Sequence, residues 1–183
     1  MSAATYISAV SAAVSIGAAS LSWRTARGAK TSDAYKLAEQ LYDRLTVGET
    51  ATARSALEFY RRAGTREAKE TREVLDAYFA LLWCFSGVRV GRRHLVEQRR
   101  INNTGPAVEF LDEEIRWHVE EWVNRWEELR GLIQRHIRPL DDHHSLEDFC
   151  KLSDEVLGFR QQVQNLREQM ADEKKQWQSA VGT

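Results

Sequence analysis

Three side chains that could carry acid–base or metal chemistry lie at helical spacing in the second half of the chain: Glu114, His118 and Glu121. Positions i, i+4 and i+7 share one face of an α-helix, so these groups could converge on a metal ion or on a proton transfer. Helical carboxylate sites normally draw ligands from several helices, often as Glu-x-x-His pairs, and the sequence contains no such pair. We therefore interpret His118 as a hydrogen-bonded residue at the edge of the core, and we expect no metal and no cofactor.

A second combination, Arg89 and His94, has the spacing Arg-x4-His. It resembles the core motif of a superfamily of helical RNases from toxin and defence systems, and the resemblance would make both residues catalytic. The same spacing arises by chance in a chain this rich in arginine, and Val90 stands where the motif usually has a polar residue. We keep the nuclease as the alternative to a function without catalysis.

Charge is unevenly distributed although the net charge is −1. Residues 89–100 contain five arginines and one acid, Glu97, whereas residues 109–128 contain eight acids and two arginines. A short turn at 102–106 joins them, so we expect the two segments to pack antiparallel and to pair with each other. Such pairing, and the absence of a net positive charge, argues against a nucleic-acid partner.

The first 23 residues carry no charge, and Arg24, Arg27 and Lys30 follow them. About 20 apolar residues span a bilayer as a helix, and a basic flank marks the cytoplasmic side. We predict a single-pass transmembrane helix with its flank at 1–30 and a cytoplasmic body. Because serines weaken this segment, a soluble helix packed on the body and a cleaved signal peptide stay open as alternatives.

Small residues in this segment could let it pack against another helix, since small and hydroxyl side chains allow close approach within a membrane. They include Ser11, Ala13, Ser15 and Gly17. We expect the contact to be with a second copy or with a partner protein. A peripheral lipid-binding module is a third class of function, and it would use four basic residues: Arg24, Arg27, Arg92 and Arg93.

Residues 31–183 are expected to form one antiparallel bundle of long helices, because the chain has only two prolines and ten glycines. The apolar spacing predicts helices at about 34–47, 50–60, 65–101 and 107–137. The stretch 74–85 is apolar nearly all round and is too short to span a bilayer, so we expect the most buried helix there. Cys84 and Cys150 lie in apolar stretches and should be buried, reduced thiols.

A last helix is predicted over 145–177, after a loop that we expect to be a solvated turn. The polar residues of that loop are Asp141, Asp142, His143 and His144. The helix carries apolar residues at heptad spacing: Phe149, Leu152, Val156, Phe159, Val163, Leu166, Met170 and Trp177. A sustained period of 3.5 residues favours a coiled-coil seam, within the bundle rather than between two parallel copies.

Taken in order, the uncharged start, its basic flank and the segments 81–87, 117–129 and 146–150 resemble a group of bacterial, N-terminally anchored helical domains of unknown function. The resemblance implies a membrane-tethered helical domain and no activity. We predict a membrane-tethered protein-interaction module whose partner, or second copy, contacts the anchor and the heptad helix.

Overall fold

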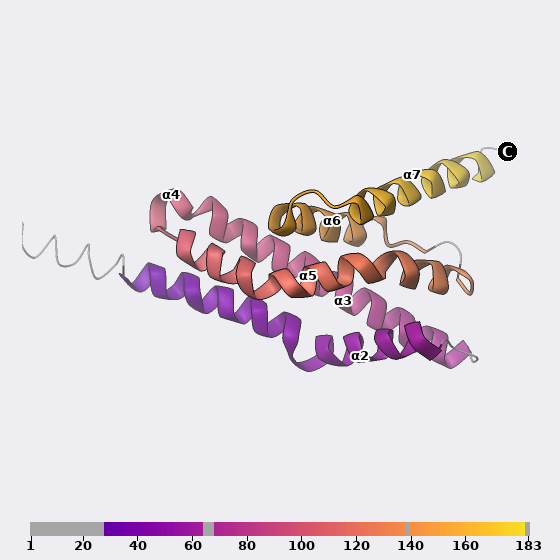
Figure 1. Ribbon diagram of the computed structural model, residues 1–183, viewed down its shortest axis with the longest axis horizontal. Coiled ribbons are helices and arrows are strands. Elements are labelled where there is room, and N and C mark those ends of the chain that lie inside the picture. The colour runs from indigo at the N-terminus through magenta and orange to yellow at the C-terminus, as the bar shows by residue number, and fades with distance from the viewer. Residues whose placement is uncertain (1–27, 64–67, 138–139, 182–183) are drawn as a thin grey trace, which may run out of the picture.

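The computed structural model describes residues 28–63, 68–137 and 140–181. Within them every regular element is a helix, so the predicted all-α bundle is confirmed. The order is a first described helix at 28–46, then α2 (Gly48–Ala63), α3 (Ala68–Glu97), α4 (Arg99–Asn102), α5 (Gly105–Gln134), α6 (His143–Leu157) and α7 (Gln161–Val181) (Figure 1). Most of the predicted anchor lies outside the described residues, including Ser11, Ala13, Ser15, Gly17, Arg24 and Arg27.

The long helix α3 is central to the bundle, as its apolar sequence predicts. It packs against α2, α5 and α6. The first described helix runs so close to it that a Cβ on Gly91 would lie 2.6 Å from Leu41. By length and composition Thr71–Glu97 could also cross a membrane, but 44% of its most apolar window is buried inside the bundle. The core helix of a soluble protein has the same properties, so this is weak evidence for a span.

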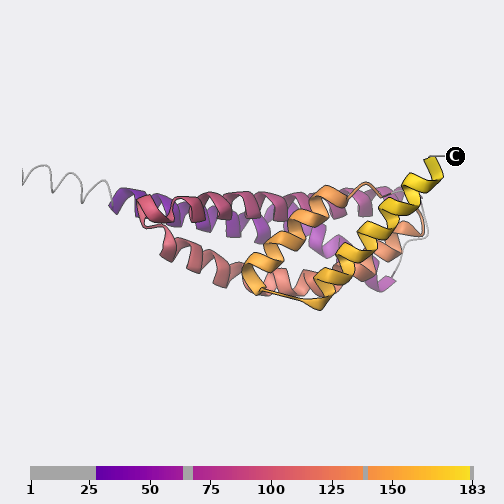
Figure 2. The same cartoon turned by 90° about the horizontal axis from the view of Figure 1, so that it is seen from above.

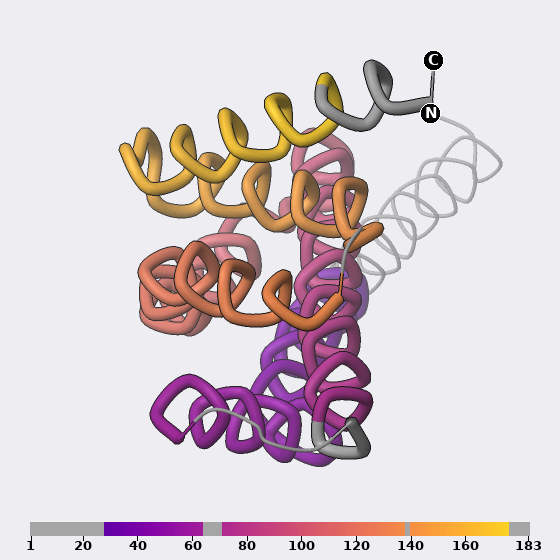
Figure 3. Tube along the Cα trace, turned by 90° about the vertical axis from the view of Figure 1, so that its right-hand side faces the viewer, coloured from indigo at the N-terminus to yellow at the C-terminus, as the bar shows by residue number. Residues whose placement is uncertain are grey.

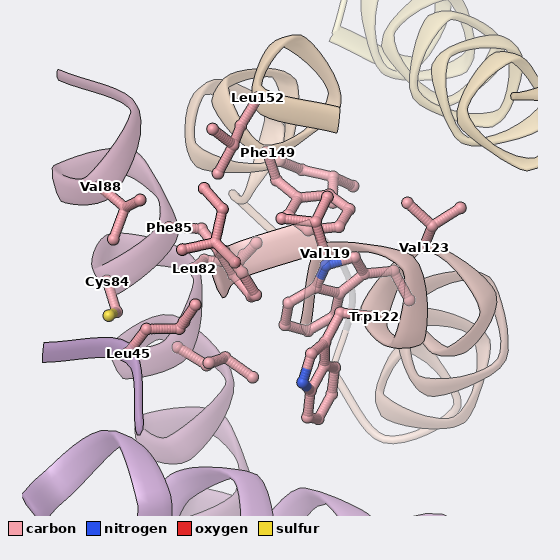
Figure 4. Close-up of a cluster of buried hydrophobic side chains, with 14 of the residues drawn as sticks. Leu45, Leu82, Cys84, Phe85, Val88, Val119, Trp122, Val123, Phe149 and Leu152 are labelled. Atoms are coloured by element: carbon pink, nitrogen blue, oxygen red, sulfur yellow. The ribbon is translucent and has the colours of Figure 1, made fainter. Parts of the chain in front are cut away.

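The apolar residues that recur every three or four positions along α5, the helix predicted over 107–137, supply the centre of the core. All eight of them are buried: Val108, Leu111, Ile115, Val119, Trp122, Trp126, Leu129 and Ile133. The Trp126 ring meets Tyr78 of α3 and Phe149 of α6 edge-to-face, with centroid separations of 5.1 and 5.6 Å. Such aromatic pairs add about 0.5–1.5 kcal/mol beyond the burial itself. Figure 4 shows side chains of α3, α5 and α6 gathered in one cluster, among them Phe85, Trp122 and Phe149.

Both cysteines are buried and free, as predicted. Burial raises the pKa of the Cys150 thiol to about 12. It also raises the pKa of Cys84, whose Sγ lies 3.3 Å from the carbonyl oxygen of Arg44. Neither thiol is therefore a ready nucleophile, because the reactive form is the thiolate.

The single last helix predicted over 145–177 is wrong, because the chain breaks into α6 and α7 at Gly158. This residue adopts φ +73° and ψ −164°, a conformation essentially restricted to glycine. Phe159 follows in the connector and is 69% exposed. Figure 2 shows α7 turning back along α6, and Arg167 of α7 pairs with Asp154 of α6 at 2.7 Å. The other described heptad residues are buried on one helix or the other: Phe149, Leu152, Val156, Val163, Leu166 and Met170.

A tight turn between α3 and α5 closes one end of the bundle, where the sequence predicts it. Asn103 ends α4 in the left-handed region at φ +52°, which asparagine tolerates better than most residues. The hydroxyl of Thr104 donates to the carbonyl oxygen of Leu95. Lys30 donates from Nζ to Oδ1 of Asn102 at 3.2 Å. The start of the first described helix and α4 therefore share this end, which lies away from the C-terminus in Figure 1.

Candidate functional site

A cavity of about 290 Å³ lies at this end of the bundle, between the first described helix and the end of α3. Its apolar floor consists of Ala34, Leu37 and Leu95. Its polar lining residues are Lys30, Asp33, His94, Gln98 and Asn102. A chain of hydrogen bonds follows the lining. The ring Nε2 of His94 lies 2.7 Å from Nε2 of Gln98, and the Asn102 amide donates to Oε1 of Gln98 at 3.1 Å. Asn102 in turn accepts from Lys30, so amide and ammonium donors gather beside an apolar floor.

The structure does not bring Arg89 and His94 together. Residues five apart on a helix point about 140° away from each other. The Arg89 guanidinium turns to α6, where it lies 3.0 Å from Asp148 and 3.1 Å from Glu155. His94 is exposed and lines the cavity at the bundle end. Arg89 is therefore held by two carboxylates, and the geometry gives the nuclease alternative no support.

The predicted pairing of the basic and acidic segments is confirmed in part. Arg92 grips Asp112 with two contacts of 2.6 and 2.8 Å, and it also lies 2.9 Å from Glu155. Arg99 lies 3.7 Å from Glu109 in a largely exposed pair. Two further acids of the segment pair instead with α2, Glu121 with Arg54 and Glu128 with Arg61. Because Arg92 is engaged in this way, it is a poor residue for lipid binding.

Glu114, His118 and Glu121 do not assemble a site. The Glu121 carboxylate is held by Arg54 and by Arg125, at 3.2 and 2.8 Å, and Glu114 is exposed. The described residues include no group of three or more potential ligands that could hold a metal. His118 was predicted to be a hydrogen-bonded residue at the edge of the core; it is 9% exposed, but its Nδ1 has no hydrogen-bond partner among those residues. Burial, helped by the charge of Arg54, lowers the pKa of His118 to about 4.

A buried polar network joins four parts of the fold, and the sequence did not predict it. Arg130 of α5 contacts the Asp142 carboxylate at 2.8 and 3.0 Å, and both side chains are essentially inaccessible. Tyr78 of α3 donates to Asp142 at 2.7 Å. The Glu173 carboxylate of α7 accepts a hydrogen bond from each terminal nitrogen of Arg130, at 2.7 and 2.6 Å. The predicted solvated turn is therefore wrong for Asp142, although Asp141 is exposed.

The pKa values within this network agree with its geometry. Burial, and then the Asp142 carboxylate, raise the pKa of Tyr78 well above its ordinary value. Burial alone would lower the pKa of Arg130, but its bonds to Asp142 and Glu173 raise it. Burial opposes ionisation of Glu173, yet hydrogen bonds from Arg130 and Gln134 lower its pKa. The network thus holds its charges in place and fastens α7 and the start of α6 to the core. Its one sequence signal is the position of Arg130, four residues after Trp126 on the buried stripe.

The outer face of α3 is the largest departure from the predicted all-round burial of residues 74–85. Trp83 is 63% exposed, and its ring centroid lies 5.8 Å from that of Phe79. Val90, seven residues further along the same face, is 57% exposed. Figure 3 shows α2 and α5 mainly on one side of α3, and the exposure of Trp83 and Val90 shows that no described helix covers these two side chains.

No family model matches the chain, and no match was found among curated proteins or among solved structures. The resemblance to anchored helical domains therefore stays a prediction.

Proposed function

We propose that the protein is a membrane-tethered helical module that binds another protein through the outer face of α3. The observation that carries this proposal is a stripe on α3 in which Trp83 and Val90 are exposed and the half-buried Phe79 packs beside Trp83. Single exposed apolar residues are ordinary, but grouped ones mark interaction sites. Tryptophan in particular is enriched among the residues that dominate the binding energy of protein interfaces.

The shape of the stripe favours a helical partner. Trp83 lies four residues after Phe79, and Val90 lies seven residues after Trp83, so the three side chains share one face of α3. They form a ridge that could pack into the groove of another helix. Exposed Arg72 and Glu97 lie beyond its two ends. An apolar centre with charged ends is typical of the core and rim of an interface. We expect the partner to present an apolar helix face of similar length.

The heptad residues are a weaker choice for the partner than the sequence indicated. Those of α6 and α7 that the structure describes are buried within the bundle, except Phe159 in the connector. The same holds for Trp122 and Trp126 of α5. Since buried side chains cannot meet a partner without unfolding, the exposed stripe of α3 takes their place in the proposal.

The tether is supported by the sequence of residues 1–30. An uncharged segment of 23 residues followed by Arg24, Arg27 and Lys30 would place the body in the cytoplasm by the positive-inside rule. Lys30 lies at one end of the bundle, beside Asn102, so a span before residue 24 would meet the body at that end and leave the α3 stripe accessible.

Two measurements on the full chain test the proposal. The chain should stay with cell membranes through a carbonate wash. A photocrosslinking amino acid at position 83 or 90 should give one discrete adduct of defined mass, and Phe79→Glu should remove it. The matched control position is 159, which is at least as exposed as 83 and 90 but lies on the α6–α7 connector. Equal adducts at 83 and 159, or adducts that survive Phe79→Glu, would contradict the proposed face. An adduct of twice the chain mass would identify the partner as a second copy.

A further inference from the structure

The end of the bundle formed by residues 28–30 and by α4 carries exposed basic side chains that make at most weak contacts with the other described residues. Lys30, Arg93, Arg99 and Arg100 are all exposed. The pairs Arg93–Glu97 and Arg99–Glu109, at 3.4 and 3.7 Å, are at least 60% exposed on both sides. No carboxylate among the described residues lies within ion-pair distance of Arg100. Exposed pairs of this kind are weak, so these charges stay available to an external anion.

The neighbouring arginines of α3 are different. Arg89 and Arg92 each have two carboxylate partners at 3.1 Å or less, and their side chains are only 16% and 11% exposed. The long basic segment of the sequence therefore divides into an inner part, which is used to join helices, and an outer part at the bundle end. Only the outer part could meet a charged surface.

An exposed isoleucine stands among these bases. Ile101 follows Arg99 and Arg100 in α4 and is 76% exposed, the highest value among the large apolar side chains described. A single apolar residue flanked by arginines is suited to a lipid interface, where the side chain enters the headgroup layer and the cations meet phosphates. The cavity beside it adds the Lys30 ammonium and the Asn102 amide, both near an apolar floor.

The tether would bring this end to the membrane. Only four residues separate Trp23, the last of the uncharged segment, from Gly28 at the start of the first described helix. Even a fully extended chain covers no more than about 18 Å over that interval. Attraction between charges and an anionic surface decays over about 8 Å at physiological salt, so the basic bundle end comes within range when this interval is shorter than about half its full extension.

We propose that this bundle end, with Lys30, Arg99, Arg100 and Ile101, is a docking surface for the headgroups of an anionic phospholipid membrane. The inference rests on the proposed tether, and it adds that the body is held against the lipid in a fixed orientation. The stripe of α3 would then project sideways from the membrane. Each basic residue at an anionic surface contributes roughly fivefold to the membrane partition.

The test uses the full chain with Ile101→Cys, labelled with an environment-sensitive fluorophore and reconstituted into vesicles. Native Cys84 and Cys150 are buried and should not label in the folded protein. In vesicles of phosphatidylcholine with about a third phosphatidylglycerol, we expect a blue-shifted label that is protected from acrylamide. In pure phosphatidylcholine the protection should be lost, as it should be at high salt. Arg99→Ala with Arg100→Ala should weaken docking by roughly 25-fold.

Phe59→Cys gives the matched control, because Phe59 is similarly exposed but lies on α2 toward the other end of the bundle (Figure 1). Its label should respond to neither lipid. A label at 101 that is equally accessible in both lipids, or equally protected in both, overturns the docking surface. A carbonate wash of the same vesicles separates the two proposals. If carbonate removes the chain from the vesicles but the label at 101 is still protected in a lipid-dependent way, only the tether is refuted. If the chain stays with the vesicles but the label shows no lipid-dependent protection, only the docking surface is refuted. A chain that fails both tests refutes both.

Discussion

Replacing Gly158 by alanine tests the break between α6 and α7. At φ +73° and ψ −164° an alanine costs about 1–3 kcal/mol of backbone strain. Alanine also lowers the conformational entropy of the unfolded chain, and this effect stabilises the folded protein by about 0.4–1 kcal/mol. A Cβ at Gly158 would meet no atom within 4 Å, so no steric clash contributes. We therefore expect Gly158→Ala to lower the free energy of unfolding by roughly 0.5–2 kcal/mol.

Gly131→Ala is the matched control. Gly131 lies inside α5, and a Cβ there would also meet nothing within 4 Å. In a helix interior the substitution should stabilise the protein by about 0.5–1 kcal/mol. The two variants thus have opposite expected signs, although both add the same methyl group to open space.

Urea denaturation followed by far-UV circular dichroism measures both effects in the same solvent. With a slope of about 2 kcal/mol per molar urea, the midpoint of Gly158→Ala should fall by roughly 0.3–1 M while that of Gly131→Ala rises. If the heptad pattern produced one continuous helix, Gly158 would be a helix-interior glycine and both substitutions would stabilise. An increased midpoint for Gly158→Ala would therefore refute the α6–α7 hairpin.

Three further outcomes are expected. Arg130→Ala leaves the inaccessible Asp142 carboxylate without its cation and should lower the free energy of unfolding by about 3–5 kcal/mol. The control Arg93→Ala, at an exposed pair, should lower it by about 1 kcal/mol or less. Similar losses in denaturant unfolding would contradict the role of the network. The pKa of His118 is about 4 in the folded protein, against about 6.5 when unfolded, so the unfolded chain binds the extra proton and stability falls as pH drops from 6.5 towards 4. His118→Leu should reduce that fall, and unfolding curves at pH 7 and pH 5 would show whether it does. Both thiols should resist Ellman's reagent until the protein unfolds, because burial raises their pKa values; rapid reaction in the native state would argue against their burial.

The sequence by itself determined the helical class and the inward faces of the main helices. Apolar side chains three or four residues apart must share one face of a helix, and that relation is local. The stripe from Val108 to Ile133 is buried along its whole length for this reason. The turn after α4 was equally readable, since Asn103 and its glycine and proline neighbours favour a chain reversal.

The tertiary structure alone decided where the heptad pattern stops. Val156 and Val163 are seven residues apart, as in one continuous heptad helix, although they lie on α6 and α7. Each is buried from its own helix, so the heptad spacing is the same whether or not the chain changes direction between them. Gly158 was visible in the sequence, but a lone glycine within a periodic segment is compatible with a continuous helix. Its positive φ is what separates the two outcomes.

The same limit applies to charge. The sequence places Arg92 and Arg99 in one basic segment. In the structure Arg92 forms an ion pair with Asp112, whereas Arg99 is exposed at the bundle end. The sequence predicted Asp142 in a solvated turn and gave no role to Arg130, and the two form the most buried ion pair described. An ion pair depends on which atoms meet across helices, and neighbouring positions in a sequence carry no record of that.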